Sequence, residues 1–125
     1  MNKTMLALKK SVLPVFILVF AIGLAAYAAD VISWKDADKH YGQTKTVEGT
    51  VVATHNTGKV CFLNFHENWK IYFTAVIFAS DFHKFPDNPE DYYLDKKVRV
   101  TGKIKKYKGK PEIILKSPAQ IKIVK

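Results

Sequence analysis

An alternating apolar segment near the C-terminus, followed by a short turn, constrains the fold of this chain most strongly. Val98, Val100 and Ile104 alternate with polar or charged residues, and a period of two is typical of a strand that is buried on one face. A turn is predicted at residues 106–110, and residues 111–115 begin a second apolar strand. The segment therefore predicts a β-hairpin with several lysines at its tip.

Three further strands are predicted upstream, at residues 44–54, 59–65 and 69–79. Gly49 inside the first of them indicates a bulge or a sharp bend. A short helix is predicted at residues 33–41, with Ser33 as its N-cap and Gly42 as its stop. Residues 80–93 contain Pro86 and Pro89 and are expected to be irregular or partly helical. The last strand breaks at 117–119 and resumes at 120–124. Five strands with one insertion between the third and the fourth predict an all-β fold, the five-stranded Greek-key barrel known as the OB-fold.

The N-terminus has the three-part layout of a secretory signal. Lys3, Lys9 and Lys10 precede an uncharged apolar stretch at 12–25, and Ala26 and Ala28 supply small residues at a cleavage site. We therefore expect a signal peptide at 1–28, a single domain at 29–125, and export to the periplasm or the extracellular space. The alternative is an uncleaved membrane anchor, because residues 11–29 reach the roughly 18 residues that span a bilayer.

The charge balance favours an anionic partner. The chain has 20 Lys and Arg against 11 Asp and Glu, and three of the lysines lie in the predicted signal, which leaves +6 on residues 29–125. Nucleic acid, a membrane surface or an acidic polymer would fit this charge, and so would a role in solubility alone. Arg99 is the only arginine. Because lysine acts as a point charge, attraction to a phosphate backbone is expected rather than bidentate readout or phosphoryl chemistry.

Several motifs carry a resemblance to a known class. They are VEGTV at 47–51, Gly58 before CFLNF at 61–65, FTAVIF at 73–78, VRVTGKI at 98–104 and YKGKPEI at 107–113. Together they resemble bacterial OB-fold domains of the nucleic-acid-binding, tRNA-anticodon-binding-like class, over roughly residues 34–125. The resemblance implies that a ligand crosses strands two and three between the loops at 55–59 and 106–110. Single-stranded nucleic acid or another polyanion is the partner that it implies.

The candidate nucleic-acid-binding residues follow from those loops and from the alternation of the strands. Tyr72 shares a predicted outer face with Lys70 and Thr74, which makes it the first candidate for stacking on a base, and Trp69 beside a turn is the second. Asn64 and His66 would join them if their face is the outer one. The complete candidate set is Lys59, Trp69, Tyr72, Arg99, Lys103, Lys105, Tyr107, Lys108 and Lys110. The alternative is that the aromatic side chains pack in the core and that the lysines protect an exposed strand edge against aggregation.

The sequence offers little for catalysis. The four histidines are scattered and lack the spacing of metal ligands, and Cys61 is expected to be a buried residue that forms no internal disulfide. We therefore expect a non-catalytic binding module without metal or cofactor. The alternative function is an exported module that binds a protein or a small ligand.

Overall fold

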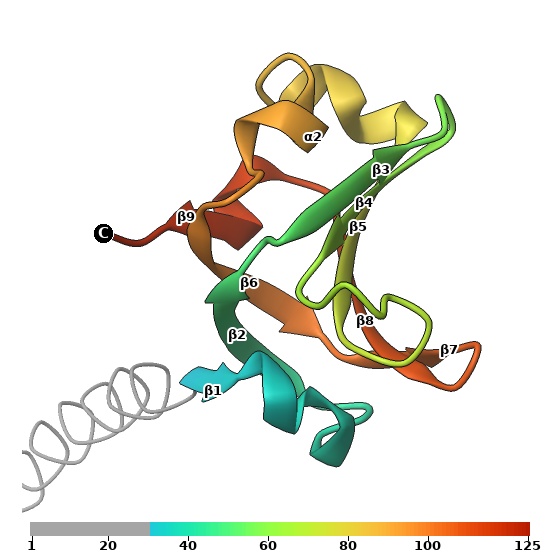
Figure 1. Ribbon diagram of the computed structural model, residues 1–125, viewed down its shortest axis with the longest axis vertical. Coiled ribbons are helices and arrows are strands. Elements are labelled where there is room, and N and C mark those ends of the chain that lie inside the picture. Colours follow the sequence, from blue (N-terminus) through green and yellow to red (C-terminus); the bar gives the residue numbers. More distant parts are fainter. Residues whose placement is uncertain (1–30) are drawn as a thin grey trace, which may run out of the picture. The chain divides into compact units, whose positions relative to one another are not determined.

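The computed structural model describes residues 31–125 (Figure 1), and the predicted signal peptide at 1–28 lies outside the described residues. One sheet has the strand order β1-β2-β6-β9, formed by β1 (Val31–Ser33), β2 (Thr44–Thr50), β6 (Lys97–Lys103) and β9 (Ile121–Ile123). The other has the order β3-β4-β5-β8-β7, formed by β3 (Ala53–Asn56), β4 (Val60–Asn64), β5 (Thr74–Phe78), β8 (Lys110–Leu115) and β7 (Lys105–Tyr107). The connections contain the 3₁₀ helices η1 (Trp34–Lys39), η2 (Ala79–Lys84) and η3 (Pro118–Gln120) and the α-helix α2 (Pro89–Tyr92).

The mostly β class that the sequence predicts is confirmed. Between residues 31 and 125 the strands are arranged as two sheets rather than as one closed barrel. Helices are short, as the prolines around 86–89 predict. No helix in this part of the chain is both long and apolar enough to span a bilayer.

The first predicted strand is divided between the two sheets at Val51 and Val52. The Val51 amide donates to the Lys96 carbonyl at 3.0 Å, whereas the Val52 amide donates to the Asn64 carbonyl at 2.9 Å. Adjacent residues thus bond to different sheets, and in Figure 1 β2 runs directly on into β3. The bend therefore lies two residues after Gly49.

The predicted bulge at Gly49 is wrong, because Gly49 pairs regularly with Val98 across β2 and β6. Gly49 has a different role in the fold. A Cβ at this position would lie 2.5 Å from Trp34 Cδ1 and 2.6 Å from Phe65 Cδ2. Glycine is needed here because two aromatic rings approach the backbone, and no turn is involved.

The third predicted strand is too long at its start. β5 begins at Thr74, and residues 69–73 belong to a loop in which the Ile71 and Tyr72 amides face the Asn68 carbonyl. This loop ends where Phe73 enters the core and packs edge-on against Phe65, with 4.9 Å between ring centroids. Burial of that ring, together with a lysine contact described below, overrides the strand propensity of the segment.

The short helix predicted after Ser33 is confirmed as η1, and the Lys35 amide donates to the Ser33 hydroxyl at 3.3 Å. It ends at Lys39, with His40 as its C-cap, and not at Gly42 as predicted. β1, which precedes η1 and runs parallel to β2, was not predicted.

The C-terminal hairpin is also confirmed, with a tighter turn than expected. Tyr107 pairs with Lys110, so only Lys108 and Gly109 form the turn, both with positive φ. That combination is the type I′ turn, whose twist matches that of the flanking strands.

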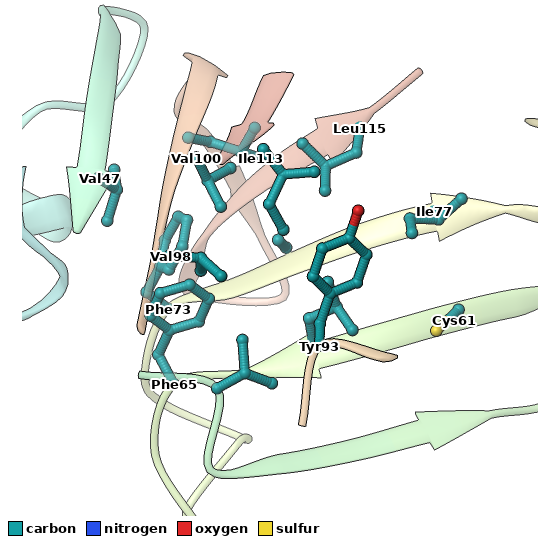
Figure 2. Packing of buried hydrophobic residues seen from close by; sticks show 14 of the residues in the cluster. Val47, Cys61, Phe65, Phe73, Ile77, Tyr93, Val98, Val100, Ile113 and Leu115 are labelled. Atoms are coloured by element: carbon teal, nitrogen blue, oxygen red, sulfur yellow. The ribbon is translucent and has the colours of Figure 1, made fainter. Parts of the chain in front are cut away.

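The core lies between the two sheets. Figure 2 shows Val47, Val98 and Val100 of the four-stranded sheet facing Ile77, Ile113 and Leu115 of the five-stranded sheet. Cys61 is part of this core and fully buried, as predicted, and burial raises the pKa of its thiol to about 12. The thiol is therefore protonated and unreactive at neutral pH.

Candidate functional site

The face of the five-stranded sheet that turns away from the core is defined by the strand register. Cross-strand partners share a face of a sheet, and Asn64 pairs with Thr74, which pairs with Glu112. His55 pairs with Phe62 in the same way, and Tyr107 with Lys110. The alternating residues, such as Cys61 and Ile77, belong to the core. The outward face is therefore unusually polar where Asn64, Thr74 and Glu112 adjoin.

A groove of about 750 Å³ lies on this face. Its buried residues are Asn64, Lys110 and Glu112, whereas Trp69 and Tyr107 are about half exposed, at 52% and 51%. The lining consists of Ala53, Thr54, His55, Phe62, Asn64, Trp69, Lys70, Tyr107, Lys108, Lys110 and Glu112. These residues come from β3, β4, the loop before β5, and the β7–β8 hairpin, which projects at the lower right of Figure 1. The groove thus crosses the second predicted strand and is bordered by the hairpin.

Lys110 organises the buried part of the groove. Its Nζ donates to the Trp69 carbonyl at 2.6 Å and to the Thr74 hydroxyl at 2.9 Å. The Thr74 hydroxyl in turn donates to Asn64 Oδ1 at 2.9 Å. These bonds attach the loop that carries Trp69 to the sheet. The expectation that Lys110 is an exposed charge at the hairpin tip is wrong, since only 7% of the residue is accessible. Burial lowers the pKa of its ammonium, and the nearby Glu112 carboxylate opposes this shift.

Glu112 is the feature of the groove that the sequence reasoning missed. It is 6% exposed, and no described residue forms a hydrogen bond or ion pair with its carboxylate. Burial raises the pKa of this carboxyl, although Lys110 and Lys105 pull it in the opposite direction. The available signal was the period of two along residues 110–114, which places Lys110 and Glu112 on one face together with Ile114.

Each of the two aromatic rings at the rim of the groove, Trp69 and Tyr107, has a lysine ammonium close to it. Lys70 Nζ lies 5.7 Å from the Trp69 ring centroid, and Lys108 Nζ lies 5.5 Å from that of Tyr107. Both distances fall in the range of cation–π contacts. The rim therefore combines flat apolar surfaces with positive charge.

Tyr72, the first stacking candidate, does not line the groove. Its ring centroid lies 4.2 Å from that of His66 and 5.6 Å from that of Trp34, in a separate aromatic cluster. The prediction of an outer face shared by Tyr72 and Thr74 is wrong, because strand alternation does not extend back into the 69–73 loop. Trp69, the second candidate, lines the groove instead, and of Asn64 and His66 only Asn64 does so.

The remaining candidates are spread more widely than expected. Arg99 lies in the four-stranded sheet, where its Nε donates to Glu48 Oε2 at 2.8 Å. Lys103 is in that sheet too, paired with Thr44. Lys105 is the cross-strand partner of Glu112 and so adjoins the groove, whereas Lys59 lies between β3 and β4 and is not among the lining residues. The structure thus brings Trp69, Tyr107, Lys108 and Lys110 together and separates Arg99, Lys103, Lys59 and Tyr72 from them.

Clusters of side chains that could bind a metal ion are absent from the described part of the chain. Residues 31–125 contain no group of three or more His, Cys, Asp or Glu side chains placed to hold a metal ion. Glu90, in the acidic segment after Pro89, instead accepts a hydrogen bond from Asn56 Nδ2 at 3.0 Å.

No protein-family model and no curated protein sequence matches the chain. Solved structures do match. Asparaginyl-tRNA synthetase from Pyrococcus horikoshii is similar over 75% of this chain at 14% identity, with a TM-score of 0.51. Aspartyl-tRNA synthetase from Entamoeba histolytica is similar over 75% at 16% identity, with a TM-score of 0.52. The match covers 23% and 21% of those two chains. The likeness shows that residues 31–125 have an OB-like, mostly β fold.

Proposed function

We propose that this chain is a non-catalytic OB-type module that binds single-stranded nucleic acid, or a polyanion of similar charge, in the groove. The observation that carries the proposal is the pair of half-exposed rings, Trp69 and Tyr107, each with a lysine ammonium within 6 Å. Aromatic platforms stack on bases while neighbouring lysines attract phosphates. The similar solved structures are tRNA synthetases, enzymes that by their names act on tRNA, and this agrees with a nucleic-acid partner.

The strand pairing supports the finer proposal of a five-stranded barrel. If β2 and β3 are taken as one bent strand, and β6 and β7 as another, the pairings run from β3 through β4, β5 and β8 to β7 and return through β6 to β2. Parallel pairing of β5 with β8 and antiparallel pairing elsewhere in this circuit fit a Greek-key arrangement. The two sheets would then be the two halves of one strongly bent barrel.

Export is also proposed, on the strength of the basic, apolar and small-residue segments at 1–28. In an exported setting the nucleic acid would be extracellular or taken up from outside. A small ligand is the second candidate, because a groove of about 750 Å³ lies within the usual range for small-molecule sites.

The test is a titration of the full chain with a fluorescein-labelled dT12 oligonucleotide at two salt concentrations. The proposal expects measurable binding that weakens as salt rises, since phosphate contacts release counterions. A double variant, Lys105→Ala with Lys108→Ala, should weaken binding and flatten the salt dependence. Lys122→Ala, an exposed lysine on β9 in the other sheet, is a control for loss of one charge elsewhere.

Two outcomes would contradict the proposal. Absence of binding at low salt would remove nucleic acid as the ligand. Binding that is unaffected by salt and by the Lys105/Lys108 change would favour the small-ligand alternative.

A further inference from the structure

The proposed function leaves Glu112 unexplained. A groove that attracts phosphates through its lysines would be weakened by a carboxylate on its floor, since like charges repel. Glu112 is nevertheless 94% buried there, and no described residue donates a hydrogen bond to it. None of the described residues has a fully buried side-chain oxygen that lacks a partner, so the unpartnered carboxylate oxygens of Glu112 remain accessible in the groove. A ligand that brings hydrogen-bond donors to this position would pair with these two oxygens.

The neighbouring groups do not supply the missing donors. The Thr74 hydroxyl, on the strand next to Glu112, gives its hydrogen to Asn64. Lys110, two residues before Glu112 on the same face, directs two bonds to the Trp69 carbonyl and to Thr74. An ammonium has three N–H groups, so one donor of Lys110 remains. The floor thus presents one donor beside a two-oxygen acceptor.

This arrangement complements one base better than the others. The Watson–Crick edge of guanine has an acceptor, O6, followed by two donors, N1–H and the N2 amino group. Two adjacent N–H groups match the two oxygens of a carboxylate, and O6 matches the remaining donor of Lys110. Thymine and uracil have a single N–H between two carbonyls. Cytosine and adenine place a ring nitrogen lone pair beside their amino group, and that lone pair would face a carboxylate oxygen.

We propose that Glu112 determines base specificity in the groove by accepting hydrogen bonds from N1–H and the N2 amino group of an unpaired guanine. The Lys110 ammonium faces O6 of that base, and the rim rings Trp69 and Tyr107 cover the planes of this base or its neighbours. Phosphates are held at the lysines of the rim, away from the carboxylate. This inference rests on the proposed function, because it concerns the same groove.

The test compares fluorescein-labelled 12-mers that are thymidine throughout except at one central position. That position carries thymidine, deoxyguanosine, deoxyinosine or deoxycytidine. We expect the guanine oligonucleotide to bind about tenfold more tightly than all-thymidine, which is typical of one bidentate base contact. Inosine, which keeps N1–H but lacks the amino group, should fall between the two, and cytosine should gain less than guanine.

Glu112→Gln should bring the ratio of the guanine and thymine Kd values close to one, because the amide keeps only one acceptor oxygen. Glu67→Gln removes the same charge at an exposed position outside the groove lining and should leave the ratio unchanged. Far-UV circular dichroism checks that both variants are folded. If Glu112→Gln does not fold, the inosine series on the unaltered chain still decides the question.

The outcomes separate the two proposals. Equal affinity of the unaltered chain for all four oligonucleotides would overturn guanine recognition and leave the proposed function standing. Equal affinity for guanine and cytosine, or a guanine preference that survives Glu112→Gln, would also overturn it. Failure of every oligonucleotide to bind at low salt would instead remove the proposed function, and this inference with it.

Discussion

Lys110 Nζ donates a hydrogen bond to the Thr74 hydroxyl at 2.9 Å, across 36 residues of sequence. The same ammonium bonds to the Trp69 carbonyl at 2.6 Å. One lysine therefore joins β8 to β5 and holds the loop that carries an exposed ring of the groove. A residue that the sequence suggested as a phosphate contact is, in the fold, a structural support for the aromatic rim.

This role predicts a stability effect that distinguishes Lys110 from its neighbour Lys108. Lys110→Met should lower the free energy of unfolding by about 1–3 kcal/mol, because it leaves the Trp69 carbonyl without its donor and removes one of the two positive charges that act on the Glu112 carboxylate. Lys108→Met, at the exposed turn, should change it by less than about 0.5 kcal/mol. Urea unfolding of both variants measures the difference. Equal effects would contradict the structural role of Lys110.

The close approach of aromatic rings to Gly49 predicts that even a methyl group is harmful there. Gly49→Ala should lower the free energy of unfolding by about 1–3 kcal/mol, because the new Cβ would overlap Trp34 and Phe65. Thr50→Ala, the adjacent exposed position, serves as the comparison. Thermal unfolding followed by circular dichroism measures both. A melting temperature for Gly49→Ala at or above that of the unaltered chain would show that the rings can move aside.

The separation of Trp69 from Tyr72 predicts different effects on ligand binding. Trp69→Ala should weaken dT12 binding about tenfold or more, as expected when a stacking platform is lost. Tyr72→Ala should alter the affinity by less than about twofold, since its ring packs on His66 and Trp34 outside the groove. Fluorescence anisotropy measures both, below the melting temperatures of the variants. A larger loss with Tyr72→Ala would place the binding surface on the other aromatic cluster.

The buried Glu112 carboxyl predicts a dependence of stability on pH. Burial raises its pKa above the ordinary value of 4.5, so the folded chain holds this proton more tightly than the unfolded chain does. The cost of ionising Glu112 in the fold is absent at a pH well below 4.5 and complete above the raised pKa. The stability of the unaltered chain relative to Glu112→Gln should therefore decrease as pH rises from about 4 to 7. Urea unfolding of both proteins at several pH values measures this. A constant difference would mean that Glu112 has the same pKa in both states.

Local patterns were sufficient for much of the fold. The alternation of Val98 and Val100 with polar or charged residues predicted a strand, and Ser33 marked the start of a short helix, because these signals depend on near neighbours in the chain. Burial of Cys61 followed from its apolar surroundings. The same local reasoning placed a bend at Gly49 and extended the third strand back to Trp69, and both were wrong. The causes lie in distant residues: Phe65 and Trp34 beside Gly49, and Lys110 beside Trp69.

The sequence by itself determined a mostly β chain with a lysine-rich hairpin, and it proposed an aromatic, basic binding surface. Only the tertiary structure decided which side chains share that surface. In the fold, Tyr72 and Arg99 lie outside the groove and Lys110 is buried. Glu112 lies on the groove floor, where no described residue donates a hydrogen bond to its carboxylate. The physical reason is that the period of a strand assigns a residue to one of two faces. Which face meets the core, and which residues adjoin across strands, depends on register and long-range packing.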